Sequence, residues 1–449
     1  MSAERQTLAE VGRLLESKAL TAEAVTEKCL ERVTEQNRSL NAFITVLVDE
    51  ALAQAREADR EIAEGRYRGP LHGVPISLKD IIDLRDAPTT AASRVRDGHV
   101  ARRDATVVSR LRQAGAIFIG KTNLHEFALG TTNEDSAYGP VLHPFDNTRS
   151  PGGSSGGSAV SVLAGMSFAS IGTDTGGSIR IPSAACGLGG LQATIGELPT
   201  DGIVPLSETL DHVGPMCVSV EDTAILYSVL RGASPTPPAS RDVRGLRFGV
   251  PRAYFLDLID PQVAARFDDA CGQLAAAGAI LDDVVIAHTK EIGPIYAHIA
   301  LAEAAAYHAA TLESRPHDYT ENVRLRLETG RYILAEDYAR AQRGRQVLIR
   351  EVREAIGGRD GLLLPSMPVP ATKLGVPVVS IGGIEETVRN ITLRLTQLFN
   401  ITGHPAISVP CGKTDEGLPV GLQIVGTRNR TPELLSVAAA VEATVGPGC

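Results

Sequence analysis

The sequence predicts an α/β protein in which helices cover both faces of a large central sheet. Between residues 67 and 220, helical patterns alternate with short apolar runs, and glycines mark the breaks between them. From about residue 246 the alternation starts again with a strand, a helix over 261–277 and another strand, which is one βαβ unit. The apolar runs after residue 400 can complete the sheet begun in the first half. We therefore expect one intertwined domain over 1–449.

The first 66 residues are expected to form a helical cover on this domain. The run "TLAEVGRLLESKAL" places Leu8, Val11, Leu14 and Leu15 on one helical face. Two further helical stripes follow, and the second of them ends at Gly65.

The region from 67 to 220 begins with a short strand. In "GVPISLKD", Val74, Ile76 and Leu78 alternate with small or polar residues, and Lys79 closes the run. A helix and an apolar strand over 116–119 follow, and "SAVSVLAGMSFASIGTD" repeats the order of helix, glycine and strand. This repetition is the main support for the α/β prediction.

Composition excludes several classes of function. The chain has 449 residues, a net charge of −9 and a pI of about 5.7, which disfavours binding to nucleic acid or to anionic membranes. No apolar run approaches the ~20 residues that a membrane helix needs. The N-terminus has charges where a signal peptide would have its apolar core. We expect a cytoplasmic protein.

The cysteines and histidines show no metal-binding pattern. No CxxC pair and no HExxH motif occurs, so we expect neither a metal nor another cofactor. The cysteines of such a chain are expected to be reduced, and most of them buried. The six are Cys29, Cys186, Cys217, Cys271, Cys411 and Cys449.

A run rich in glycine and serine, "SPGGSSGGSA" over 150–159, has three interpretations. Such a composition is typical of a flexible linker. A phosphate loop has the same features, but the Gly-Lys-Ser/Thr ending of that motif is absent. The third interpretation is an acyl-transfer site, because an apolar helix begins immediately afterwards and its N-terminus offers unpaired amides.

A second run, "GTDTGGSIR" over 172–180, favours the acyl-transfer interpretation. Ser178 follows a Gly-Gly pair at the end of an apolar strand, where a hydroxyl is exposed. Main-chain amides of this turn can form an oxyanion hole, and one such donor is worth about 3–4 kcal/mol. The amides in question belong to Thr175, Gly176, Gly177 and Ser178.

A serine nucleophile needs a base. Ser178 does not lie in the GxSxG motif of α/β-hydrolases, which disfavours a Ser-His-Asp triad on that fold. Lys79 ends an apolar strand, and burial there would favour its neutral form. Taken alone, Lys79 is better interpreted as an ordinary lysine.

The chain resembles the amidase signature enzymes over nearly its whole length. The resemblance is carried by several motifs in one order, which makes it very specific. They are "GVPISLKD", "GKTNLHEFALG", "SPGGSSGGSA", "GTDTGGSIRIPSAACGLGGLQAT", "TLDHVGPM" and "GLPVGLQIVG".

The resemblance implies a fold and a catalytic triad. The fold is a large central mixed β-sheet covered by helices on both faces. The triad is Ser–cis-Ser–Lys, with Ser178 as nucleophile, Ser154 as the bridging residue after a cis peptide bond, and Lys79 as the base. The reaction is cleavage of amide C–N bonds through an acyl-enzyme. The same triad in this family also opens carbamates, so urethane hydrolysis is an open alternative.

Further residues receive weaker assignments. Asp174 is interpreted as ordering the serine loop or as an ordinary turn former. Arg180 is interpreted as the partner in a structural salt bridge, in preference to a contact for an acidic substrate. Ser155 either binds Lys79 or caps the following helix. "EFALG" matches a substrate-facing loop, which makes the carbonyl of Ala128 a candidate contact, and Ser154 is a second candidate for substrate binding.

Two histidines and one cysteine near these motifs are not expected to be catalytic. His72 and His125 are interpreted as surface residues or as residues behind the site. Cys186 is expected to be a packing residue.

The resemblance leaves the substrate open. Among named relatives the motifs are similar to those of the A subunit of glutamyl-tRNA(Gln) amidotransferase, which grips glutamine with an aspartate and an arginine. Here no carboxylate occurs in "VRNITLRLTQLF" over 388–399, although Arg345 could match the arginine. The stretch "GLQATIGELP" over 190–199 also departs from the pattern of that relative. We therefore expect a stand-alone hydrolase of small neutral amides, with a homodimer as one alternative and a non-catalytic assembly module as the least favoured interpretation.

Within the single domain, four regions are expected. A helical cover spans 1–66, the catalytic core 67–220, a variable βαβ and helical region that builds the substrate pocket 246–400, and closing strands 400–449.

Overall fold

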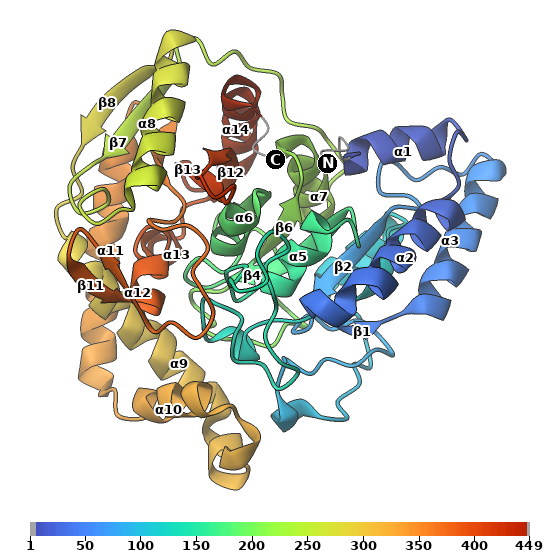
Figure 1. Cartoon of the computed structure of the whole chain (residues 1–449), viewed down its shortest axis with the longest axis horizontal. Helices are drawn as coiled ribbons and strands as arrows, with labels where there is room; N and C mark the ends of the chain where they lie inside the picture. Colours follow the sequence, from blue (N-terminus) through green and yellow to red (C-terminus); the bar gives the residue numbers. More distant parts are fainter. Residues whose placement is uncertain (1–5, 447–449) are drawn as a thin grey trace.

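An eleven-stranded mixed sheet forms the centre of the computed structural model, which describes residues 6–446 (Figure 1). Its strands follow the order β1-β3-β2-β4-β6-β5-β12-β13-β9-β7-β8. The bounds are β1 (Phe43–Val46), β2 (Pro75–Lys79), β3 (Ile117–Thr122), β4 (Ala169–Asp174), β5 (Gly189–Gln192), β6 (His212–Cys217), β7 (Arg247–Pro251), β8 (Ile280–Val284), β9 (Gly361–Pro365), β12 (Ala406–Lys413) and β13 (Pro419–Val425). A separate hairpin pairs β10 (Val378–Ile381) with β11 (Ile384–Thr387).

Parallel and antiparallel pairs alternate in blocks along this sheet. Strand β2 is parallel to both β3 and β4, and β7 is parallel to β8 and β9. Between these blocks, β6, β5, β12 and β13 run antiparallel to their neighbours. The last strands of the chain thus lie in the middle of the sheet and join its two parallel blocks, as expected for the runs after residue 400.

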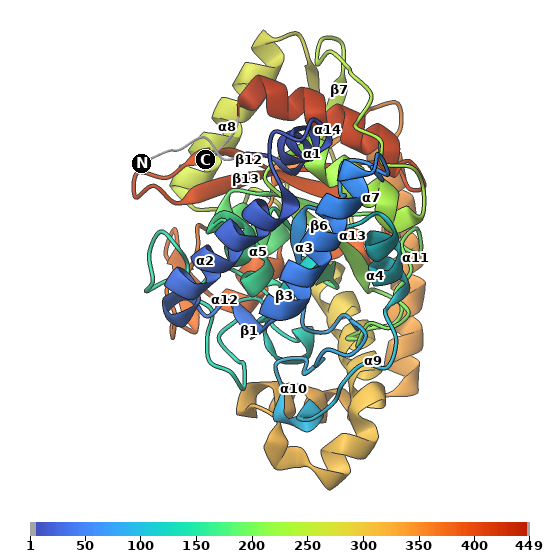
Figure 2. The same ribbon diagram turned by 90° about the vertical axis from the view of Figure 1, so that its right-hand side faces the viewer.

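Helices flank the sheet, in agreement with the predicted fold class. In both views α9 and α10 lie at the opposite end of the molecule from α8 and α14 (Figures 1 and 2). The bounds are α1 (Leu8–Glu16), α2 (Ala22–Leu40), α3 (Val48–Ala63), α4 (Thr106–Gln113), α5 (Gly156–Leu163), α6 (Arg180–Cys186), α7 (Val220–Arg231), α8 (Pro261–Ala276), α9 (Ile292–Ser314), α10 (Glu321–Gly330), α11 (Ala335–Ile356), α12 (Val388–Leu393), α13 (Gln397–Thr402) and α14 (Thr431–Val445).

Local sequence signals explain where several helices begin. Thr7 and Glu10 form a reciprocal capping box at α1, with the Thr7 hydroxyl accepting from the Glu10 amide at 3.1 Å. Asp260 caps α8, and Pro261 occupies its first turn, where a missing N–H costs nothing. The predicted helix over 261–277 is therefore confirmed to within one residue.

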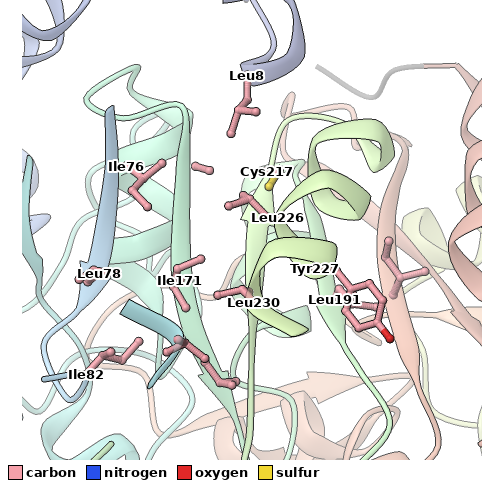
Figure 3. Close-up of a cluster of buried hydrophobic side chains, with 14 of the residues drawn as sticks. Leu8, Ile76, Leu78, Ile82, Ile171, Leu191, Cys217, Leu226, Tyr227 and Leu230 are labelled. Atoms are coloured by element: carbon pink, nitrogen blue, oxygen red, sulfur yellow. The ribbon is translucent and has the colours of Figure 1, made fainter. Parts of the chain in front are cut away.

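The apolar residues of the first strands form the main core. Ile76 and Leu78 of β2, Ile171 of β4 and Leu191 of β5 are fully buried, and Figure 3 shows them in one cluster with Leu230 of α7. Both faces of β2 and β4 are buried, including the small or polar residues that alternate with the apolar ones. This core holds the strand ends that carry the candidate site.

Strand β3 extends further than the sequence predicts. The expected strand over 116–119 continues through Gly120 and Lys121 to Thr122. Lys121 is fully buried because its Nζ lies 2.9 Å from the buried Asp80 carboxylate. Periodicity cannot reveal such a pair, because the partner lies in another segment of the chain.

No helix among residues 6–446 is long and apolar enough to cross a bilayer.

Candidate active site

Lys79 lies at the end of β2, between β3 and β4, and its side chain is fully buried. Its Nζ donates to the Ser154 hydroxyl at 2.7 Å and to the Thr173 hydroxyl at 2.8 Å. Burial lowers the pKa of Lys79 from 10.5 to about 7, while the charges of Asp174 and Asp211 oppose this shift. The amine is therefore available as a neutral base near neutral pH.

Ser154 follows a cis peptide bond after Gly153, directly before α5. Its carbonyl accepts from the His125 amide at 3.1 Å. A Cβ at Gly153 would lie 2.9 Å from the backbone nitrogen of Asn133 and 3.0 Å from the carbonyl carbon of Thr131. This glycine is thus required by a close approach of two backbones. The glycine-serine run is an ordered part of the site and not a linker.

Ser178 lies between β4 and α6, and 5% of it is exposed. The Ser155 amide donates to the Ser178 carbonyl at 3.2 Å, which holds the two serine loops against each other. The Ser178 hydroxyl has no hydrogen-bond partner among the described residues, Ser154 included. Catalytic hydrogen bonds often tighten only when substrate is bound.

The Gly-Gly pair before Ser178 is required by close packing. A Cβ at Gly176 would lie 2.5 Å from the Tyr296 hydroxyl. Gly177 has φ +143°, and a Cβ there would lie 2.2 Å from the Thr396 hydroxyl. Within residues 6–446, the amides of Gly176, Gly177 and Ser178 donate to no acceptor. These three N–H groups are free to stabilise an oxyanion.

A buried ion pair orders the serine loop. Asp174 accepts from Arg180 Nη2 at 3.1 Å and from the Ile179 amide at 3.1 Å, and both charged side chains are fully buried. Arg180 and Asn400 hold the pKa of Asp174 at about 2 against the opposing effect of burial. Arg180 also donates to Gln423 Oε1 at 2.6 Å and to Asn400 Oδ1 at 2.7 Å. Arg180 forms a structural salt bridge with Asp174, and Asp174 holds the serine loop in place.

Asp211 is an acidic group of the site that sequence analysis did not single out, although it lies in the quoted "TLDHVGPM". It accepts from the Thr175 hydroxyl at 2.6 Å and from the amides of Leu206 and Ser207 at 2.8 and 3.1 Å. Burial raises its pKa to about 6. Asp211 therefore fixes Thr175, at the start of the candidate oxyanion loop.

The structure corrects the two roles considered for Ser155. Its hydroxyl donates to the Thr173 carbonyl at 3.2 Å, and Lys79 bonds to Ser154 and Thr173 instead. Helix α5 also has no side-chain cap at this residue. Ser155 ties the bridging loop to the end of β4 because its hydroxyl points across to that strand.

Ala128 lines a cavity of about 420 Å³ together with Thr173 and Thr175. Ala128 and Phe127 have positive φ values of 60° and 49°, which non-glycine residues seldom adopt. The loop is held by the variable helices, because Glu126 Oε2 accepts from the Thr320 amide and hydroxyl at 2.8 and 2.6 Å. Arg326 of α10 donates to the Leu129 carbonyl at 2.8 Å.

Most of the remaining lining of this cavity comes from the segment 200–212. The sequence predicts that the region 246–400 builds the pocket. That region instead contributes Glu303, Ala306 and Tyr307 of α9 to an adjoining cavity of about 300 Å³. The difference arises because 200–212 is an irregular segment between β5 and β6, where periodicity carries no signal.

Three residues from the weaker assignments lie partly or fully inside the protein. Arg345 donates to the carbonyls of Ile401 at 2.6 Å and Thr209 at 3.0 Å, and it does not line the cavity beside Thr173. His72 and His125 are 1% and 2% exposed, so the surface interpretation is wrong for both. His72 Nε2 lies 3.0 Å from the Glu61 carboxylate, and His125 Nε2 lies 3.2 Å from the Asp135 carboxylate. These carboxylates belong to neighbouring segments of the chain and give both rings a polar partner inside the protein.

Two further groups were missed by sequence reasoning. Thr173 holds Lys79 from the next strand, and Tyr296 of α9 covers Gly176. Burial raises the pKa of Tyr296 to about 12, so its hydroxyl stays protonated. Neither residue belongs to a sequence motif, because each contacts a residue that is far away in the chain. Within residues 6–446, no three His, Cys, Asp or Glu side chains gather as metal ligands.

Comparison with known proteins identifies the family. The sequence model of the family Amidase matches residues 24–435. An amidase of Pseudomonas putida is 41% identical over 430 residues, covering 92% of this chain and 91% of the relative. The A subunit of the glutamyl-tRNA(Gln) amidotransferase of Koribacter versatilis is 36% identical, covering 95% of this chain and 96% of the relative.

A solved structure of an amidase superposes with a TM-score of 0.93 at 35% identity, over 98% of this chain and all of the other. The chain belongs to the amidase signature family and is a hydrolase that acts on amide C–N bonds.

Proposed function

We propose that the chain is a stand-alone serine amidase in which Ser178 attacks, Ser154 relays the proton and Lys79 accepts it. The observation that carries the proposal is the 2.7 Å contact between Lys79 Nζ and Ser154 Oγ, made by an amine whose pKa lies near 7. Small amides are the substrate class, and carbamates fit the same chemistry, since their carbonyl carries a similar C–N bond.

The mechanism begins with a proton relay. Neutral Lys79 takes the proton of the Ser154 hydroxyl as Ser154 takes the proton of Ser178. The Ser178 oxygen then bonds to the carbonyl carbon, and the amides of Gly176, Gly177 and Ser178 hold the oxyanion, with Thr175 as a fourth candidate donor.

Collapse of the tetrahedral intermediate breaks the C–N bond. The proton held by Lys79 returns through Ser154 to the leaving nitrogen, which departs as the amine or ammonia. Water then attacks the acyl-enzyme, its proton moves to the same relay, and the acid leaves with Ser178 regenerated. A carbamate follows the same steps.

A fluorophosphonate probe tests this assignment and separates it from a non-catalytic role. We expect the probe to label the wild-type chain and to fail with Ser178→Ala, while Ser39→Ala, an exposed serine on α2, labels normally. Lys79→Ala should lose turnover of anilides, primary amides and carbamates while keeping its circular dichroism spectrum. Near-normal turnover by Ser178→Ala rules the mechanism out.

The glutaminase component of an amidotransferase is the second candidate, because one relative at 36% identity has that name. We favour other amides over glutamine because Arg345 Nε donates to the Ile401 carbonyl and Nη2 to the Thr209 carbonyl. Ammonia release from glutamine, together with co-purification of partner proteins, would favour this candidate. We expect neither.

A further inference from the structure

Acidic and acceptor groups line the cavity beside Thr173 and Thr175. Its charged lining residues are Asp201, Glu208 and Asp211, and no lysine or arginine is among the described residues that line it. The adjoining cavity shares Glu208 and adds Glu303, again without a basic residue among the described lining. The charge that bounds the space beside Thr173 and Thr175 is therefore negative.

No ion pair among residues 6–446 neutralises the three carboxylates of the first cavity. Asp201 accepts from the Thr106 hydroxyl at 2.5 Å, and Asp211 accepts from Thr175 and two amides. Glu208 is exposed and makes no hydrogen bond or ion pair with any described residue. Carboxylates around a concave site focus a negative potential there, which the charge of Lys79 near Asp211 offsets in part.

His212 gives independent evidence about the ligand. It lines the same cavity, is 4% exposed, and its Nδ1 lies 2.8 Å from the Leu210 carbonyl and 3.2 Å from the Asp174 carbonyl. Both carbonyls are acceptors, and the third neighbour, Asn400 Nδ2 at 3.5 Å, already donates to Asp174 at 2.9 Å, so Nδ1 carries the proton. Burial lowers the pKa of His212 to about 4, so the ring is neutral and Nε2 is an acceptor. This buried Nε2 has no partner among the described residues.

We propose that this cavity selects amide substrates that carry a positively charged N–H donor, such as an alkylammonium group, and rejects substrates with a carboxylate at the same place. The inference rests on the proposed amidase activity and names the substrate class of that site. An ammonium group donates hydrogen bonds to the acceptor groups that line the cavity, and the carboxylate of Glu208 balances its charge. A carboxylate there faces like charges and finds no side chain of opposite charge in the described lining.

The test is competition against fluorophosphonate labelling of Ser178 by three amides of matched length. They are 5-aminopentanamide, hexanamide and adipamate, which are cationic, neutral and anionic. We expect 5-aminopentanamide to protect Ser178 at roughly fivefold lower concentration than hexanamide, and adipamate to protect least. The preference should shrink at high salt, because salt screens partly exposed charges.

Glu208→Gln removes the free counter-charge and should reduce the preference of the cationic over the neutral amide by about threefold. Glu35→Gln is the matched control, an equal charge change at an exposed position of α2 that does not line the cavity. We expect the control to keep the wild-type ratio.

The outcomes separate this inference from the proposed function. Any of four results overturns the inference alone. They are equal protection by the three amides, better protection by adipamate, no protection by any of them, and a ratio that is unchanged in Glu208→Gln. Failure of the probe to label Ser178 at all overturns the proposed function.

Discussion

Lys79 must be uncharged to act as a base, and its surroundings supply the cause. Burial removes water from the ammonium form, and the nearest partners of Nζ are two neutral hydroxyls. The carboxylates of Asp174 and Asp211 work in the opposite direction and keep the pKa from falling below the useful range. These opposing effects leave about half of the Lys79 side chains neutral near pH 7.

The pH profile of turnover should report this base. Because the neutral amine is the active form, log kcat/KM should rise with slope one below pH 7 and level off above it. The measurement is initial rate against pH in buffers of constant ionic strength. A profile that falls as the pH rises through neutrality would contradict the role of Lys79.

Asp211→Asn should move the acidic limb of that profile to lower pH. The Asp211 charge raises the pKa of Lys79, so its removal favours the neutral amine at lower pH. The same initial-rate measurement checks this, with Glu208→Gln as a control for loss of a cavity carboxylate. An upward shift would mean that Asp211 does not act on Lys79 electrostatically.

Individual residues were predictable from the sequence where a motif carries them. The positions of Lys79, Ser154 and Ser178 follow from three separate motifs, and the fold brings their segments together. Thr173 and Tyr296 were not predictable, because a threonine on a strand and a tyrosine in a helix have many ordinary explanations. Their contacts depend on how strands and helices distant in sequence are arranged.

The loop 126–129 shows how the variable helices act on the site. Glu126 receives two hydrogen bonds from Thr320, which precedes α10, and Phe127 packs edge-on against His308 of α9 with centroids 4.3 Å apart. These contacts hold the unusual backbone of Phe127 and Ala128 in place. Helices far from Lys79 can therefore adjust substrate binding.

Thr320→Val should weaken substrate binding more than the chemical step. It removes the 2.6 Å hydroxyl contact to Glu126 but keeps the amide contact, so the loop loosens without losing its fold. We expect KM to rise roughly fivefold with kcat within about twofold. Thr329→Val, whose hydroxyl bonds within α10, is the control and should change neither. A fall in kcat alone would contradict this interpretation.

The Asp174–Arg180 pair joins four elements, because Arg180 of α6 reaches β4, α13 and β13. Arg180→Met leaves a buried carboxylate without its counter-charge and should lower the free energy of unfolding by about 3–5 kcal/mol. Urea denaturation measures this. Arg13→Met, which breaks an exposed pair with Glu221, should cost about 0–1 kcal/mol. Equal effects of the two changes would contradict a bracing role.

At the scale of the whole molecule, alternating helices and strands predicted the α/β class, and glycine breaks predicted the ends of a few helices, such as Gly65 after α3 and Gly165 after α5. The strand order was not predictable from residues alone. Strand β5 pairs with β12, which lies in the last part of the chain, and periodicity gives no register for such a pair. The place of 200–212 in the cavity wall follows from the same long-range arrangement.

We propose that the chain folds as a single unit because the sheet is shared. Residues 1–240 alone would leave β5 without β12, with the buried Leu191 exposed beside an unpaired edge. We expect this fragment to be insoluble or to lack a cooperative thermal transition, whereas the full chain melts in one step by circular dichroism. A fragment that melts cooperatively would refute the single-unit account.

The most direct test of the central claim is to trap the acyl-enzyme. Turnover of an amide substrate would be quenched in acid within one catalytic cycle, and the digested protein examined by mass spectrometry. The account predicts the mass of the acyl group on the peptide that contains Ser178, and its absence in Ser178→Ala. An acyl group on any other residue, or turnover by Ser178→Ala, would contradict it.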